Sequence, residues 1–90
     1  MNIKDEMRVN VYGIIIPFSW NNKGDVTGIC INTFDEEEFV ISKYGKGKTL
    51  LKHLSQLVEV WGRVKKSKDG KKNIVISSFK IKGMSDEKGS

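Results

Sequence analysis

Apolar and polar residues alternate along most of this chain, a pattern typical of strands with one buried side. Met7–Ile16 begins with this alternation and then becomes wholly apolar. Val26–Asn32 and Glu38–Ser42 are rich in β-branched and aromatic residues, and Val58–Lys65 alternates without a break. Asn73–Ile81 repeats the pattern near the end of the chain. The sequence therefore predicts five strands over these segments.

One segment between the third and fourth predicted strands has a different period. Leu50, Leu51, Leu54 and Leu57 recur at helical spacing, so we predict a short helix over residues 49–57. Thr49 stands where its side chain can cap the first turn of this helix.

The order of elements is three strands, a short helix and a two-stranded hairpin. Residues 20–25 and 35–37 are predicted turns, and Lys68-Asp69-Gly70-Lys71 contains the Asp-Gly pair that tight hairpins favour. This order, within 90 residues, predicts a mainly β protein: a five-stranded β-barrel of the oligonucleotide/oligosaccharide-binding (OB) type with one short helix between strands three and four. We expect a single domain over residues 1–83 and a flexible tail over 84–90.

The run Val58-Glu59-Val60-Trp61-Gly62-Arg63-Val64, the Lys/Asp/Gly turn after it and Ile74-Val75-Ile76 carry a resemblance. On these residues, the segment from Val26 to Lys82 resembles small bacterial OB-fold proteins, among them uncharacterised single-domain proteins and nucleic-acid-binding relatives. In that pattern the glycine, here Gly62, relieves crowding where the barrel bends. The resemblance implies a fold and no single activity, since OB folds bind nucleic acid, oligosaccharide, protein and small ligands.

Composition changes this picture in one respect, the compartment. The chain is 38% hydrophobic and 30% charged, with a single cysteine that cannot form an intrachain disulfide. Its N-terminus lacks the apolar stretch of a secretion signal. The longest apolar run, Ile14–Ile16, is far shorter than the roughly 20 residues of a membrane span. We expect a cytoplasmic protein with no membrane partner.

Motifs for catalysis are nearly absent. Cys30 is the only cysteine and is expected to be a small buried or half-buried hydrophobic residue, and His53, the only histidine, lies on the polar side of the predicted helix. Zinc sites need three or four ligands at set spacings. Residues 45–49 lack the first glycine and the spacing of a phosphate-binding loop, and the acidic run 35–38 is interpreted as a solvated turn rather than a cation site. We expect no enzyme activity, catalytic residue, metal or cofactor.

The charge of the chain is unevenly placed. Residues 1–42 carry three basic and seven acidic side chains, a net charge of −4, whereas residues 43–90 carry thirteen basic and four acidic ones, a net charge of +9. Five lysines fall within eight residues around the last hairpin, and two tryptophans stand near cations. A flat aromatic ring beside cations suits single-stranded nucleic acid, because the ring stacks on bases while the charges follow phosphates. The predicted nucleic-acid-binding residues are Trp20, Lys23, Trp61, Arg63, Lys65, Lys66, Lys68, Lys71 and Lys72.

Two observations weigh against nucleic acid, so a second function stays open. The acidic turn belongs to the second and third strands, which form the usual binding face of an OB fold. That face also lacks a paired set of aromatic residues, because Phe39 and Ile41 are expected in the core. Trp20 and Trp61 also have a structural interpretation, as plugs or packing residues. The first hypothesis is a non-catalytic module that binds single-stranded DNA or RNA weakly and mainly through charge. The alternative is a protein-interaction or self-associating module, because the opposed charges of the two halves suit head-to-tail contact or an acidic partner.

Overall fold

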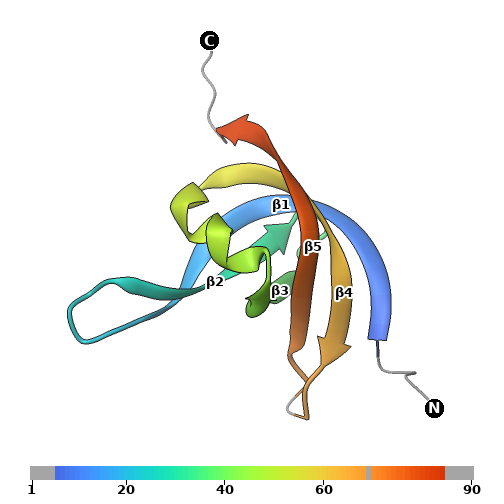
Figure 1. Ribbon diagram of the computed structural model, residues 1–90, viewed down its shortest axis with the longest axis horizontal. Helices are drawn as coiled ribbons and strands as arrows, with labels where there is room; N and C mark the ends of the chain where they lie inside the picture. Colours follow the sequence, from blue (N-terminus) through green and yellow to red (C-terminus); the bar gives the residue numbers. More distant parts are fainter. Residues whose placement is uncertain (1–5, 69, 85–90) are drawn as a thin grey trace.

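The computed structural model describes residues 6–68 and 70–84, and they form a barrel of five strands. The hydrogen-bonded order is β1-β2-β3-β5-β4, and the ring is closed by pairing of β4 with β1 (Figure 1). This confirms the predicted mainly β, OB-type barrel with one short helix between strands three and four. The predicted tail lies outside the described residues except for Met84, the last residue of β5. The elements are β1 (Glu6–Trp20), β2 (Val26–Thr33), β3 (Glu38–Gly45), a 3-10 helix η1 (Gly47–His53), β4 (Gln56–Lys66) and β5 (Lys72–Met84).

Strand β1 is shared by two parts of the barrel. Its first part, Glu6–Ile14, pairs with β4, and its second part, Gly13–Trp20, pairs with β2. The ribbon curves around the barrel to do so (Figure 1). The strand is longer than the predicted Met7–Ile16, because a bulge beyond Pro17 ends the regular alternation while the pairing continues.

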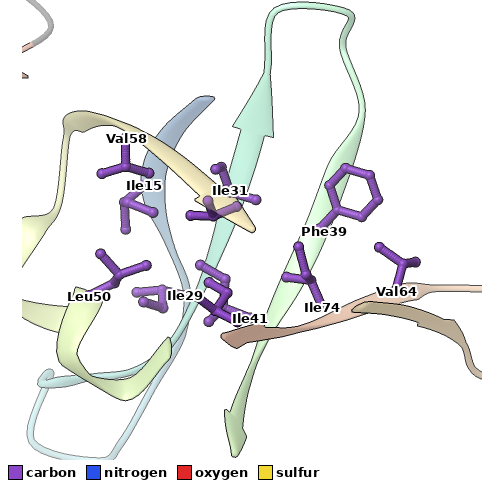
Figure 2. Close-up of a cluster of buried hydrophobic side chains, with 11 residues drawn as sticks. Ile15, Ile29, Ile31, Phe39, Ile41, Leu50, Val58, Val64 and Ile74 are labelled. Carbon is purple, nitrogen blue, oxygen red and sulfur yellow. The ribbon is translucent and has the colours of Figure 1, made fainter. Parts of the chain in front are cut away.

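The barrel interior is filled by the inward-facing apolar residues of every strand. Figure 2 shows these side chains converging, with Leu50 of η1 entering from the helix side. Burying each such side chain stabilises the fold by roughly 1.5–3 kcal/mol relative to exposure. The core residues are Ile15, Ile29, Ile31, Phe39, Ile41, Leu50, Val58, Val60, Val64, Ile74 and Ile76.

The predicted helix is present between β3 and β4, but it does not extend over residues 49–57. The helix is a 3-10 helix over Gly47–His53, and Lys46, not Thr49, occupies its N-cap without a side-chain hydrogen bond. It ends early because Ser55 has a positive φ of 68° and donates its backbone N–H to the carbonyl of Ile15 at 2.7 Å. Leu57 therefore belongs to β4, and its helical spacing from Leu50 and Leu54 does not reflect a shared helix.

Gly62 has the role that the resemblance to OB-fold proteins implies for it. A Cβ at this position would lie 2.3 Å from the carbonyl oxygen of Val75. The register between β4 and β5 shifts at the same place, leaving Ser77 as an extra residue whose hydroxyl donates to the carbonyl of Trp61 at 3.0 Å. Close approach of the two backbones at this bend thus requires glycine.

The described part of the chain contains no helix that is long and apolar enough to cross a membrane.

Candidate functional site

The order of strands defines two opposite outer faces of the barrel. In a ring of five strands, β4 stands across from the pair β2 and β3, so side chains that point outward from them face opposite directions. We call the outer surface of β2 and β3, with the neighbouring end of β1, the β2–β3 face. In OB folds, this face and the β1–β2 and β4–β5 loops are the usual ligand-binding surface.

A β-bulge turns Phe18 onto the β2–β3 face. Pro17 pairs with Ile29 and Ser19 pairs with Gly28, so Phe18 is the extra residue on β1. Bulges of this kind re-aim a side chain and are frequent beside functional sites. The Phe18 side chain is 40% exposed, and the ammonium of Lys71 lies 5.3 Å from the centre of its ring. The fold thus places an accessible aromatic ring next to a cation.

Gly28 leaves the space in which this bulge fits. A Cβ on Gly28 would lie 2.5 Å from the Ser19 hydroxyl oxygen and 3.6 Å from Cδ2 of Phe18. The Ser19 hydroxyl is held in place by a 3.0 Å hydrogen bond with the hydroxyl of Thr27. The position of Phe18 is therefore set by its neighbours on β2.

Two hollows lie on either side of Phe18 and Val40, which line both of them. The lysine-rimmed hollow has a volume of about 260 Å³, an apolar floor that includes Ile29, Ile41 and Leu51, and Lys43 and Lys48 at its edge. The hairpin hollow has a volume of about 190 Å³ and is bounded by Glu38, Gly70, Lys71 and Lys72. We call the two hollows together the trough, and their linings extend from residues of η1 to residues of the β4–β5 hairpin.

The lysine-rimmed hollow exists because β2 and β3 diverge. Their pairing joins Cys30–Asn32 to Val40–Glu38. Beyond it, β3 turns to pair in parallel with β5, through Ile41 and Gly45. Within the described chain, no pairing links Val26–Ile29 of β2 to the end of β3, so two strand edges border the hollow.

The lysines of the hairpin fall into separate groups. Lys72 lies over the Phe39 ring at 5.1 Å and pairs with Glu37 at 3.6 Å, which partly compensates its charge. Lys71 faces Phe18. Lys66 and Lys68 are exposed in the hairpin itself, whose turn is closed by Ser67 N–H donation to the Lys71 carbonyl at 2.8 Å. The hairpin thus places Lys71 beside Phe18 on the β2–β3 face and leaves Lys66 and Lys68 exposed to solvent.

The β1–β2 turn is built by one asparagine. The side-chain oxygen of Asn21 accepts hydrogen bonds from the backbone N–H groups of Lys23 at 2.8 Å and Asp25 at 3.0 Å. This Asx-type turn follows Trp20, which ends β1 and is more than half exposed. Figure 1 shows this hairpin projecting from the barrel, and Trp20 and Lys23 belong to it by their place in the sequence.

The remaining predicted residues lie on the opposite face. Trp61 of β4 is 37% exposed and stands between Asn10 of β1 and Ser78 of β5. Arg63 is directly across from Arg8, and Lys65 follows on the same side of β4. The structure therefore does not bring Trp61, Arg63 and Lys65 together with Lys71 and Phe18.

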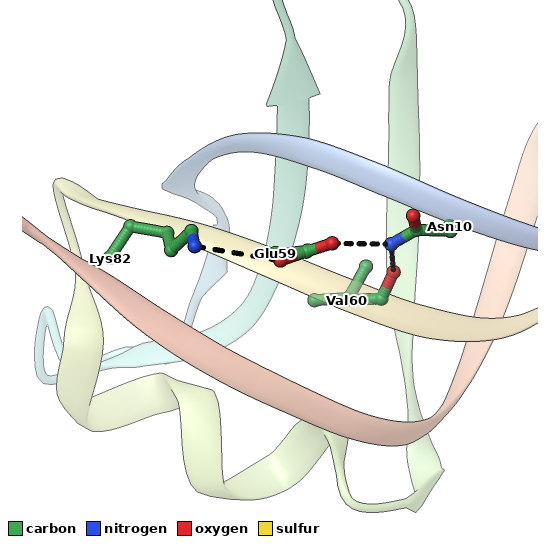
Figure 3. Close-up of polar contacts among 4 residues, drawn as sticks. All are labelled: Asn10, Glu59, Val60 and Lys82. Atoms are coloured by element: carbon green, nitrogen blue, oxygen red, sulfur yellow. Dashed lines mark hydrogen bonds and ion pairs between the residues drawn. The ribbon is translucent and has the colours of Figure 1, made fainter.

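Internal contacts occupy part of that opposite face (Figure 3). The amide nitrogen of Asn10 donates to a Glu59 carboxylate oxygen and to the carbonyl of Val60, both at 3.1 Å. The other Glu59 oxygen lies 3.7 Å from the ammonium of Lys82, which also lies 5.7 Å from the centre of the Tyr12 ring. These contacts link β1, β4 and β5 and so stabilise this side of the barrel.

Cys30 and His53 both have structural surroundings. Cys30 is 1% exposed, as predicted, and its thiol donates to a Glu38 carboxylate oxygen at 3.4 Å. Burial, together with this hydrogen bond and the charge of Glu38, raises the pKa of the thiol to about 12, so it is protonated near neutral pH. His53 is half-buried, with Nδ1 2.9 Å from the Gln56 side-chain oxygen and its ring tilted against Phe79. Among the described residues, no three His, Cys, Asp or Glu side chains gather as a metal site requires.

Comparison of the chain with protein-family models, curated proteins and solved structures finds no match.

Sequence reasoning missed Phe18. Its signal is weak, an aromatic residue after a proline at the end of the apolar run. The bulge that exposes it breaks the alternation from which exposure is inferred, so periodicity could not have placed this side chain.

Proposed function

We propose that this chain is a non-catalytic OB-type module that binds single-stranded nucleic acid across its β2–β3 face. The observation that carries the proposal is Phe18, turned outward by a bulge, held near the Lys71 ammonium and flanked by two hollows. A base stacked on an aromatic side chain contributes about 1–3 kcal/mol without regard to base identity, and cations beside the ring hold the backbone.

The lysines along the trough can contact successive phosphates of a bound nucleic-acid strand. Lys43 and Lys48 lie at one end of it, and Lys71 lies at the other, near the exposed Lys66 and Lys68 of the hairpin. The acidic groups at this end are engaged within the protein, Glu37 by Lys72 and Glu38 by the Cys30 thiol. We assign phosphate contacts to the lysines at both ends, with Trp20 and Lys23 extending the site along the β1–β2 hairpin.

Trp61, Arg63 and Lys65 have a lesser part in this assignment. Because their side chains lie on the opposite side of the barrel, a nucleic-acid strand bound on the β2–β3 face has to leave that face to reach them. Lys72 is likewise less available for phosphate, since it already pairs with Glu37.

The test is a nitrogen–proton NMR titration with short single-stranded DNA and RNA at two salt concentrations. We expect shifts at Phe18, Gly28, Val40 and Lys71 and at the Trp20 indole. Phosphate contacts by five lysines, Lys43, Lys48, Lys66, Lys68 and Lys71, imply an affinity loss of about 130-fold between roughly 50 and 200 mM salt, since single strands follow a slope of about −0.7 per contact. A spectrum unchanged at the lower salt would overturn the proposal.

A matched pair of charge reversals tests the face. Lys71→Glu removes a cation beside Phe18, and Lys80→Glu makes the same charge change on β5, at a position across from Glu59. We expect Lys71→Glu to weaken binding and flatten the salt dependence, with Lys80→Glu changing it far less. Equal losses in both variants would indicate a delocalised charge effect and contradict a site on the β2–β3 face.

A further inference from the structure

We propose that the chain also associates head-to-tail with a second copy of itself, with the Phe34 turn of one molecule entering the lysine-rimmed hollow of the next. The contact needs no nucleic acid and so goes beyond the function proposed above. Both halves of it are present on each molecule.

The first half is an exposed aromatic anchor with acidic neighbours. Phe34 is 71% exposed at the turn between β2 and β3, and Asp35, Glu36 and Glu37 follow it. Solvent exposure of a phenylalanine to this extent leaves most of its apolar surface for a partner to bury.

The turn that carries the anchor is already ordered. The backbone N–H of Thr33 donates to the Glu37 carbonyl at 2.8 Å, and that of Glu36 donates to the Thr33 carbonyl at 3.0 Å. The Thr33 hydroxyl oxygen accepts from the Glu37 N–H at 3.1 Å. A preformed turn loses little conformational freedom when it docks.

The second half is the lysine-rimmed hollow. Its volume is about 260 Å³, its floor is apolar through Ile29, Ile41 and Leu51, and its rim carries Lys43 and Lys48. The described residues that line it include no aspartate or glutamate. An apolar floor with a cationic rim complements a phenylalanine followed by carboxylates, because the floor can bury the ring and the lysines can pair with the carboxylates.

The two halves of one molecule cannot meet each other. They lie toward opposite ends of β2, and the seven residue-to-residue steps from Thr27 to Phe34 span about 23 Å at the rise of a strand. The contact is therefore intermolecular and heterologous, and it leaves a free anchor and a free hollow at the ends of every open assembly. Repetition gives rings or open chains, which a symmetric dimer contact does not.

Two variants separate the halves. Phe34→Ala removes the anchor and keeps the hollow, whereas the double variant Lys43→Glu/Lys48→Glu reverses the rim and keeps the anchor. Each has a matched control that makes a similar change elsewhere. Met7→Ala removes another exposed apolar side chain, and Lys52→Glu/Lys80→Glu makes the same charge change at exposed lysines outside the hollow.

The assay is sedimentation velocity of the nucleic-acid-free protein over a range of concentrations up to about 1 mM. At that upper limit, association with a Kd as weak as about 1 mM is still detected. We expect the wild type and both controls to sediment faster as concentration rises, and less so in high salt. Each anchor or rim variant alone stays monomeric. An equimolar mixture of the two forms a dimer and nothing larger, because it has one working anchor and one working hollow.

Several results would overturn the proposal. One is a wild type that stays monomeric throughout, and another is a mixture that shows no dimer although both variants give folded NMR spectra. Wild-type-like association of either single variant would point to a different contact. A further contrary result combines a monomeric wild type with an NMR titration of isotope-labelled Lys43 and Lys48. If their signals move only when another acidic peptide is added, such as a capped peptide of alternating aspartate and valine, the hollow binds a different protein. Because nucleic acid is absent, none of these outcomes bears on the nucleic-acid proposal.

Discussion

Replacing Phe18 by alanine is the sharpest perturbation of the proposed nucleic-acid face. Phe18 occupies a bulge, so its backbone makes no regular cross-strand pair that the substitution could disturb. Its side chain is 40% exposed and lies outside the buried core cluster. The change therefore removes an aromatic surface from the trough and leaves the barrel interior as it is.

The size of the effect follows from one stacked base. Loss of one base–aromatic stack costs about 1–3 kcal/mol, which corresponds to a roughly 5- to 150-fold increase in Kd. We expect the lower part of this range, because more than half of the Phe18 side chain is already covered by the protein. The salt dependence should hardly change, since the lysines remain and each phosphate contact keeps its counterion release.

The assay is a fluorescence anisotropy titration of a labelled single-stranded oligonucleotide, with Trp61→Ala as the paired variant. Trp61 is similarly exposed, 37% against 40%, and lies on the opposite face of the barrel. We expect Phe18→Ala to weaken binding by at least about 5-fold and Trp61→Ala to change it by less than about 2-fold. The reverse result would refute the β2–β3 face and favour the Trp61 side that the sequence pattern suggested.

Three further predictions test the barrel itself. Gly62→Ala sets a methyl group 2.3 Å from the Val75 carbonyl oxygen, and we expect a loss of about 2 kcal/mol and a Tm lower by about 8–16 °C in thermal circular dichroism; an unchanged Tm contradicts the crowding. Leu50→Ala should cost about 3 kcal/mol in urea unfolding and Leu54→Ala less than half of that, because only Leu50 is fully buried. The Cys30 thiol has its pKa raised from 9.0 to about 12, so the unfolded state loses its proton first and stability falls as pH rises. Between pH 7 and 10 the wild type should lose about 1.4 kcal/mol more than Cys30→Ala, and parallel pH profiles would exclude this linkage.

The strands were predictable from the sequence because the barrel buries one side of each. Val58–Lys65 alternates cleanly, and all three valines of that run lie in the core. The helix was predicted too long because leucine spacing alone does not reveal where the chain turns. Ser55 ends the helix by adopting a positive φ and bonding to Ile15, a residue forty positions earlier in the chain.

The candidate site was predictable only in part, for a geometric reason. The hairpin lysines cluster in sequence, so their gathering at one hairpin needed no tertiary information. Which side each faces depends on the strand register: it turns Lys71 toward Phe18, ties Lys72 to Glu37 and leaves Trp61 on the far face. Phe18 was missed because a bulge cancels the alternation that would have marked it.

The two proposed binding events use overlapping parts of the same surface, so they compete. Phe18 lines the lysine-rimmed hollow as well as the hairpin hollow, and Lys43 belongs to the rim in both proposals. A nucleic acid that fills the whole trough and an incoming Phe34 turn therefore need overlapping surface and the same positive charge. By linkage, each ligand weakens the other to the same degree. Self-association is driven by protein concentration, so dilute protein favours the nucleic-acid complex and concentrated protein favours the chain of copies. The Kd of Phe18→Ala has its simple meaning only in the dilute regime, where the hollow is empty of a second molecule.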